Sequence, residues 1–202
     1  VHNVTFTASG TEASETPYTG EITAKNEVVI KAGEGEDAAE VTANYDITVE
    51  NGTLTINKTD AELTVSLEDQ EYVYDAEAHY LTTTPVTNEK TGVTTVEYSI
   101  DGTNWTTDLS SLTATTVADT KTIQVRATNP NYNNVAENTA TLTITARPVT
   151  FTAESETREY TGSLITIRGL TVTETAEGKG LVEGHVHNVT FTASGTEASE
   201  TP

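Results

Sequence analysis

The sequence predicts an all-β protein, and three observations lead to this prediction. Thr is the commonest residue, with 44 copies in 202, and β-branched residues lose rotamer freedom in helices but fit a pleated surface. Apolar and polar residues alternate in many short runs, which is typical of strands with one buried face. No long apolar helical pattern is present. We therefore expect small β-sandwich modules in series, forming an elongated rod.

The serial arrangement follows from an internal identity. The first seventeen residues, VHNVTFTASGTEASETP, return letter for letter as residues 186–202. Such identity indicates a tandem array with a period of 185 residues (186 minus 1). We expect the chain to be a window from a longer series, in which Val1 and Pro202 are not natural ends.

Residues 1–56 are predicted to form the C-terminal half of a module. They end in NGTLTI at 51–56, where a turn-forming Asn precedes alternation of Thr with Leu or Ile, the pattern of a terminal strand. The string TATLTI at 139–144 has the same pattern and predicts a second module end. A new alternating run follows each end after a very short linker, at 58–60 and at 146–148. Short linkers, one with Pro148, restrict bending and favour a stiff rod.

Residues 57–146 are predicted to form one complete module of about ninety residues, a common size for an immunoglobulin-like sandwich. Alternation places the following residues on its core face: Leu63, Val65, Leu67, Val96, Tyr98, Ile100, Ile123, Val125, Ala127, Leu142 and Ile144. Asp101-Gly102 between two alternating runs predicts a tight hairpin. Trp105 is expected to pack on that hairpin, with an exposed ligand platform as the alternative.

Residues 147–202 are predicted to form the N-terminal half of the next module. Joined through the period, residues 147–185 and residues 1–56 would make a second complete module, whereas isolated halves would leave open sheet edges and an unfinished core. We expect neighbouring copies, head to tail, to complete them.

The charge limits the partners. Ten basic residues against 31 acidic ones give a net charge of −21, which argues against binding to nucleic acid or an anionic membrane, because both need a cationic surface. The chain has no Cys and no Met, which suits an oxidising extracellular location. No stretch is long or apolar enough to span a bilayer, so no membrane insertion is expected in this segment.

Several strings resemble a known family of repeats. EYVYDAEAHY at 71–80, VEYSIDGTNWT at 96–106 and VRATNPNYNNV at 125–135 are similar to the MBG or YDG-type tandem repeats of bacterial cell-surface adhesin-like proteins. EYTG at 159–162, GLVEGHVHNVTFT at 180–192 and NYDITVENGTLTI at 44–56 resemble the related type. The resemblance implies an immunoglobulin-like extracellular module and no catalytic residues. The usual Tyr-Asp-Gly reads Tyr74-Asp75-Ala76 here, so a positive φ at Ala76 stays open.

Few residues suggest chemistry. Glu34, Glu36, Asp37 and Glu40 lie in a Gly-rich run, GEGEDAAE at 33–40, and are weak candidates for a calcium site. A solvated acidic loop is the favoured interpretation, because the spacing of an EF-hand loop is missing. His185 and His187 have the period-two spacing that would put both rings on one strand face, without an evident third ligand; His2 and His79 complete the set.

No nucleophile motif or phosphate-binding loop is present, so we expect no enzymatic activity. A spontaneous isopeptide bond would involve Lys25, Lys31 or Lys121.

Two functions remain open at this stage. The preferred one is a spacer in a long extracellular bacterial surface stalk or fibre. The alternative is an adhesin module that binds host glycan or protein weakly and gains avidity from repetition. An exposed cluster of aromatic side chains would favour the alternative, and the residues to inspect are Tyr18, Tyr72, Tyr74, Tyr80 and Tyr132.

Overall fold

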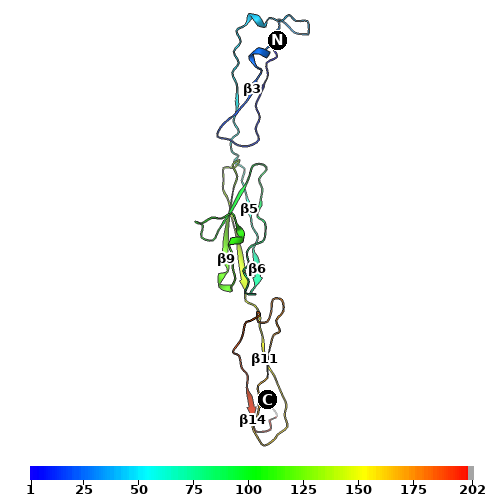
Figure 1. Ribbon diagram of the computed structural model, residues 1–202, viewed down its shortest axis with the longest axis vertical. Coiled ribbons are helices and arrows are strands. Elements are labelled where there is room, and N and C mark those ends of the chain that lie inside the picture. Colours follow the sequence, from blue (N-terminus) through cyan, green and yellow to red (C-terminus); the bar gives the residue numbers. More distant parts are fainter. Residues whose placement is uncertain (200–202) are drawn as a thin grey trace. The chain divides into compact units, whose positions relative to one another are not determined.

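The computed structural model describes residues 1–199 and confirms that the protein is all-β (Figure 1). In this part of the chain the only helices are four 3-10 turns of three residues each, at Lys25–Glu27, Thr42–Asn44, Leu109–Ser111 and Val117–Asp119. The strands are β1 (Phe6–Thr7), β2 (Tyr18–Thr19), β3 (Glu21–Ile22), β4 (Thr53–Leu54), β5 (Val65–Ser66), β6 (Gln70–Val73), β7 (Val86–Thr87), β8 (Thr95–Ser99), β9 (Lys121–Thr128), β10 (Ala136–Thr145), β11 (Phe151–Ala153), β12 (Ile165–Ile167), β13 (Leu170–Val172) and β14 (Ala193–Gly195).

The chain divides into two compact units. The first comprises Val1–Leu67, Pro85–Tyr98 and Val125–Asn138, and the second comprises Glu68–Thr84, Ser99–Gln124 and the remainder from Thr139. Each unit is therefore assembled from segments far apart in the sequence. The predicted boundaries at 56/57 and 146/147 stay predictions.

The largest sheet has four strands in the order β6, β10, β9, β8, and Figure 1 labels β6 and β9 within it. β6 and β10 are parallel, with Gln70 opposite Leu142 and Tyr72 opposite Ile144. A separate antiparallel pair joins β5 to β7, with Val65 opposite Thr87.

The core follows the alternation that the sequence predicts. Along β9, Ile123, Val125 and Ala127 are buried, while the residues between them are half-buried or exposed. Leu63, Val65, Leu67, Leu142 and Ile144 are buried as well. Of the buried apolar side chains in the described part, only Val28 lies outside the range 63–144.

The segment after β8 differs from the prediction. Ile100 is 53% exposed, and Ser99 is buried in its place. β8 ends at Ser99 because the Asp101 carboxylate turns the chain, and no strand of the described part follows before β9 begins at Lys121. The predicted tight hairpin is therefore wrong. Val96 is half-buried, whereas Tyr98 lies in the core as expected.

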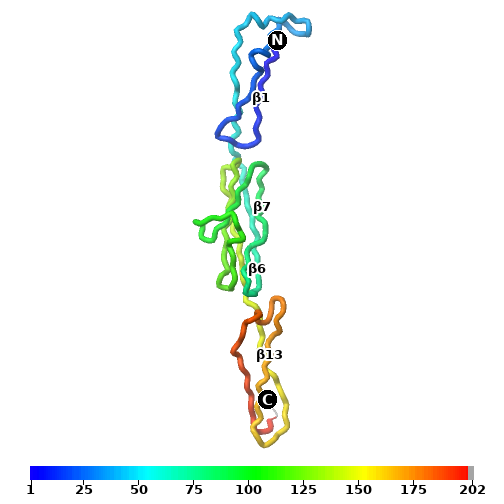
Figure 2. Tube along the Cα trace, viewed as in Figure 1, coloured from blue at the N-terminus to red at the C-terminus, as the bar shows by residue number. Residues whose placement is uncertain are grey.

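Residues 1–56 form short antiparallel ladders (Figure 2). β1 pairs with β3, and β2 pairs with β4. The predicted terminal strand at 51–56 is reduced to Thr53–Leu54. Burial is slight: apart from Gly20, Val28 is the single buried residue of this range.

Residues 147–199 likewise form only short antiparallel pairs of strands. β11 pairs with β13 and β12 pairs with β14, each over three residues. Within the described part of this range only Gly180 is buried. Small ladders with so little buried surface are marginal by themselves.

Candidate functional site

Two clusters of polar contacts hold the predicted linkers, and they are the best-defined site-like features of the chain. The first, here called the Asn131 cluster, comprises Glu12, Ala13, Thr91, Asn129 and Asn131. The second, the Arg147 cluster, comprises Tyr74, Arg147, Ala176, Lys179 and Gly180. Each cluster lies within one of the two compact units.

Asn131 acts in its cluster as a peptide group would. Its Oδ1 accepts from the backbone N–H of Ala13 at 2.6 Å, and its Nδ2 donates to the Glu12 carboxylate and to the Thr91 carbonyl. Asn129, which is 5% exposed, supports it by accepting from the Asn131 N–H at 2.9 Å and donating to the Thr91 carbonyl at 3.1 Å. An Asn side chain has one acceptor and two donors, which suits this bridging role.

The linker at 58–60 is bound to the same loop. Thr59 N–H donates to the Asn131 carbonyl at 2.8 Å, and the Thr59 carbonyl accepts from Asn133 N–H at 3.2 Å. The Asn133 amide donates to the Asp60 carboxylate at 2.6 Å. The predicted linker is therefore bonded to this loop through both backbone groups of Thr59 and through the Asp60 side chain.

Arg147 lies in the second predicted linker and donates to backbone carbonyls only. Its Nε reaches Gly180 at 2.8 Å, and its Nη2 reaches Ala176 at 2.6 Å and Lys179 at 2.8 Å. Its Nη1 makes a longer contact of 3.4 Å with the Tyr74 carbonyl. The guanidinium presents five N–H groups in a fixed fork, which allows one side chain to hold a turn and a strand end together.

The turn after β6 takes the positive φ that the resemblance left open. Ala76 has a φ of 70° and Gly162, in the corresponding string, has a φ of 71°. Asp75 Oδ1 accepts from Glu77 N–H and lies 2.9 Å from His79 Nε2. The hydrogen bond with His79, followed by the one from Glu77, lowers the pKa of Asp75 below its ordinary value. The turn is thus stabilised by its own carboxylate.

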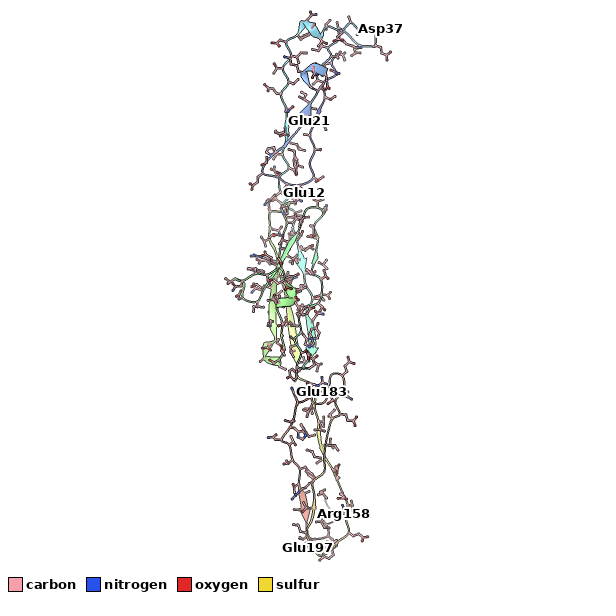
Figure 3. All side chains as sticks on the ribbon, viewed as in Figure 1. Glu12, Glu21, Asp37, Arg158, Glu183 and Glu197 are labelled. Atoms are coloured by element: carbon pink, nitrogen blue, oxygen red, sulfur yellow. The ribbon has the colours of Figure 1, made fainter. Side chains whose placement is uncertain are left out.

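The predicted acidic loop is open and solvated. Gly33 and Gly35 have positive φ, and Lys31 Nζ donates to the Glu36 carbonyl at 3.2 Å. Glu34, Glu36, Asp37 and Glu40 are all exposed, and Figure 3 shows Asp37 at the outer end of the loop. Within residues 1–199 the structure brings no three His, Cys, Asp or Glu side chains together in a group that could hold a metal ion.

The histidines do not share a face. Residues 185–187 are not in a strand, so the prediction that His185 and His187 lie on one strand face is wrong. His185 lies 6.0 Å from the Tyr74 ring, and His187 meets Phe151 edge-on at 4.8 Å. His79 stacks on Tyr72 at 4.2 Å. His2 Nδ1 accepts from Val4 N–H.

The aromatic residues are mostly involved in packing. Tyr132 is buried, Tyr18 donates to the Glu12 carbonyl, and Tyr72 donates to the Tyr80 carbonyl. Tyr80 is 39% exposed, and the more exposed rings, Tyr45 and Tyr160, are ones that the sequence did not single out. Trp105 is half-buried, and its Nε1 donates to the Gly102 carbonyl, so it contacts the loop that replaces the predicted hairpin.

The three lysines considered for an isopeptide bond have other contacts. Lys25 lies 3.7 Å from Asp46, with both side chains exposed. Lys31 and Lys121 donate to backbone carbonyls. Such bonds need a buried carboxyl group beside the amine, and these contacts do not provide one.

Sequence reasoning missed both clusters. Four Asn residues between 129 and 134 were a usable signal, because Asn side chains often hydrogen-bond to backbone groups in turns. Arg147 had no such signal, since its partners are carbonyls distant in sequence.

Comparisons of the chain with protein-family models, with curated proteins and with solved structures found no match. The resemblance to MBG or YDG-type repeats thus stays a prediction from the strings quoted above. In the part of the chain that the structure describes, none of the helices has the length and the apolar character that crossing a bilayer requires.

Proposed function

We propose that this chain is a structural repeat of a long extracellular bacterial surface stalk or fibre, in which immunoglobulin-like β-sandwich modules act as spacers. The observation that carries the proposal is that both predicted linkers are hydrogen-bonded to their surroundings, through Thr59 and through Arg147. A spacer needs a restricted geometry between successive modules, and hydrogen bonds at the linkers support this role. The identical segments at 1–17 and 186–202 support repetition of that geometry.

The charge and composition fit the same role. A net charge of −21 keeps neighbouring chains apart and soluble. The absence of Cys and Met leaves no thiol or thioether to oxidise outside a cell.

The test is the length of arrays that contain one, two and three 185-residue periods. In electron micrographs the contour should be straight and should grow by a constant increment per period. A flexible chain of beads would instead show an end-to-end distance that rises roughly as the square root of the number of periods. Arg147→Ala together with Asn131→Ala should increase the bending of a straight array; if the double variant stays straight, the linkers are not what stiffens it.

The alternative, an adhesin module, is favoured by the exposed rings of Tyr160 and Tyr45, which are 64% and 56% exposed. Exposed aromatic faces are the usual platforms for weak carbohydrate contacts. A glycan array probed with the multivalent form would detect such binding. Loss of a signal in Tyr160→Ala but not in Val186→Ala, an apolar control that is 91% exposed, would favour this function over the spacer.

A further inference from the structure

The identical segment makes different strand pairs in its two positions. As residues 1–17 it pairs through Phe6–Thr7 with Glu21–Ile22. As residues 186–199 it pairs through Ala193–Gly195 with Ile165–Ile167. Subtracting the period of 185, Ala193–Gly195 corresponds to residues 8–10, so the two pairings use adjoining stretches that do not overlap. A single copy of the segment therefore has the backbone groups needed to form both strand pairs.

The side-chain contacts of the identical segment also differ between its two positions. At Gly10 an added Cβ would lie 2.4 Å from the Tyr18 ring, which covers this position. The corresponding Gly195 has no heavy atom within 4 Å of such a Cβ. In the other direction, Phe151 packs on the His187 ring, whereas the corresponding His2 lines an open apolar hollow together with Val1, Val4, Val28, Ile30 and Ile47. The N-terminal copy thus lacks the Phe151 contact, and the C-terminal copy lacks the cover that the Tyr18 ring gives Gly10.

We propose that a second copy of this chain completes the range 1–56 by strand addition. β12 of one copy pairs with Ala8–Gly10 of the other, in the register Ile165 to Gly10, Thr166 to Ser9 and Ile167 to Ala8, which transfers the pairing seen with Ala193–Gly195. The inference deepens the proposed function, on which it rests, because in a tandem series the same pairing would form between successive periods.

Phe151 enters the hollow in this arrangement. It belongs to the same range as β12, and its contact with His187 transfers to His2. Phe151 would bury its ring against the apolar side chains that line the hollow, of which Val1 is exposed and Val4, Ile30 and Ile47 are half-buried in the single copy. Removal of this apolar surface from water is the driving force for the association.

The N-terminal copy of the segment is the one that stays in place. It is fixed by the β1–β3 pair, by the Tyr18 hydroxyl on Glu12 and by Asn131 on Ala13. The C-terminal copy is attached to its range by the three-residue pair with β12 and by the Phe151–His187 contact. The incoming strand therefore displaces Ala193–Gly195 and leaves residues 1–17 where they are.

Cysteine pairs test the register directly, because the chain has no Cys of its own. Directly opposite residues of an antiparallel pair have Cα atoms about 4.5 to 5.5 Å apart, within the range of a disulfide. The full chain with Ser9→Cys and Thr166→Cys is oxidised mildly at about 0.15 M salt, which screens the repulsion between acidic chains beyond about 8 Å. We expect disulfide-linked dimers and higher multiples on a non-reducing gel, increasing with protein concentration.

Two other pairs are the controls. Ser9→Cys with Thr152→Cys has equally exposed positions but pairs Ser9 with a residue of β11, which faces β13, and should give no ladder. Thr166→Cys with Ser194→Cys should close within one chain, lowering the intact mass by two hydrogens. An equal ladder in the first control overturns the proposal, and so does failure of the second pair to close. Closure of the second pair without a ladder from Ser9 and Thr166 overturns it as well.

Adding Phe151→Ala to the Ser9 and Thr166 cysteine pair distinguishes specific docking from random collision between chains. The ladder should weaken about tenfold or more, since a large apolar contact is lost. Thermal unfolding followed by Trp105 fluorescence should not change, because Phe151 lies outside the range 63–144 that holds the core. An unchanged ladder contradicts the role given to Phe151. Straight arrays without a ladder would leave the spacer function intact and refute only this pairing.

Discussion

Single carboxylates hold several turns of this chain, and Asp101 is the clearest case. Its oxygens accept from the backbone N–H groups of Thr103 and Asn104, both at 2.8 Å, and from the Asn104 side-chain amide and the Ser99 hydroxyl. These bonds, led by the one from the Asn104 backbone, place the pKa of Asp101 well below its ordinary value of 3.8. They also end β8 and thereby expose Ile100, so a local interaction overrides strand alternation here.

Asp101→Asn should destabilise the protein in a pH-dependent way. A depressed pKa in the folded state means that the carboxylate stabilises the fold fully above the unfolded pKa of about 3.9 and loses this effect as the pH falls below it. The melting temperature of the variant should therefore lie below that of the wild type near pH 7, with the gap closing towards pH 2. Asp37→Asn, in an exposed loop, is the control and should melt with the wild type throughout. A gap of equal size at all pH values would mean that charge is irrelevant to the loop.

Ala76→Gly should stabilise the protein. Ala76 has a φ of 70°, a conformation that costs a non-glycine residue about 1–2 kcal/mol, and the extra freedom of Gly in the unfolded chain offsets part of the gain. The expected net effect is about 0.5 to 1 kcal/mol in urea unfolding. Ala78→Gly, two residues on without a positive φ, should destabilise by about 0.5 kcal/mol. Equal effects of the two changes would show that the turn conformation is not the cause.

At the scale of elements, two kinds of strand coexist. β9 and β10 are long and bury one face, β9 at Ile123, Val125 and Ala127 and β10 at Ala140, Leu142 and Ile144. The strands of residues 1–56 and 147–199 contain two or three residues each and bury almost nothing. Near the predicted linkers, side-chain hydrogen bonds of Asn131 and of Arg147 add to the backbone hydrogen bonds of these shorter ladders.

Arg147→Ala should loosen the turn at 176–180. The change removes three short hydrogen bonds to carbonyls, and bonds from a charged donor contribute about 1.5–3 kcal/mol each when well formed, less when half-exposed. Hydrogen exchange at the amides of Lys179 and Gly180 should accelerate at least about tenfold, which corresponds to roughly 1.4 kcal/mol. Arg147→Lys should recover only part of the protection, because an ammonium lacks the planar fork. Wild-type exchange in the Lys variant would refute the geometric argument.

At the scale of the whole molecule, the buried apolar surface is confined to one stretch. Apart from Val28, the buried apolar residues of the described part fall between Leu63 and Ile144. Apolar burial is the main favourable term in folding. Stability should therefore be distributed very unevenly along the chain.

Hydrogen exchange of the full chain should reveal this distribution. Amides of β9 and β10 should exchange only by global unfolding, whereas amides in 1–56 and 147–199 should exchange orders of magnitude faster in dilute solution. If strand addition between copies takes place, protection at residues 8–10 should rise with protein concentration while β9 is unaffected. Uniform protection at low concentration would contradict the uneven distribution of buried apolar residues along the described chain.

The sequence by itself determined the fold class and most of the core. β-branched composition and two-residue alternation depend on local geometry alone, so they predicted an all-β chain and the buried faces at Leu63–Leu67, Ile123–Ala127 and Leu142–Ile144. The identity of residues 1–17 and 186–202 is likewise a property of the sequence. From this identity we predict a tandem series with a period of 185 residues (186 minus 1).

Only the tertiary structure decided the rest. The Arg147 hydrogen bonds join groups about thirty or more residues apart in the sequence, and the Asn131–Ala13 hydrogen bond joins residues 118 apart. No local sequence pattern predicts contacts over such separations. The exposure of Ile100 depended on a turn that side-chain hydrogen bonds to Asp101 set, and residues 185–187 follow a turn closed by the backbone bond from His185 N–H to the Val182 carbonyl. The identical segment forms different strand pairs in its two positions because each copy has different neighbours. The partner of a strand depends on the surrounding chain and not on the strand's own sequence.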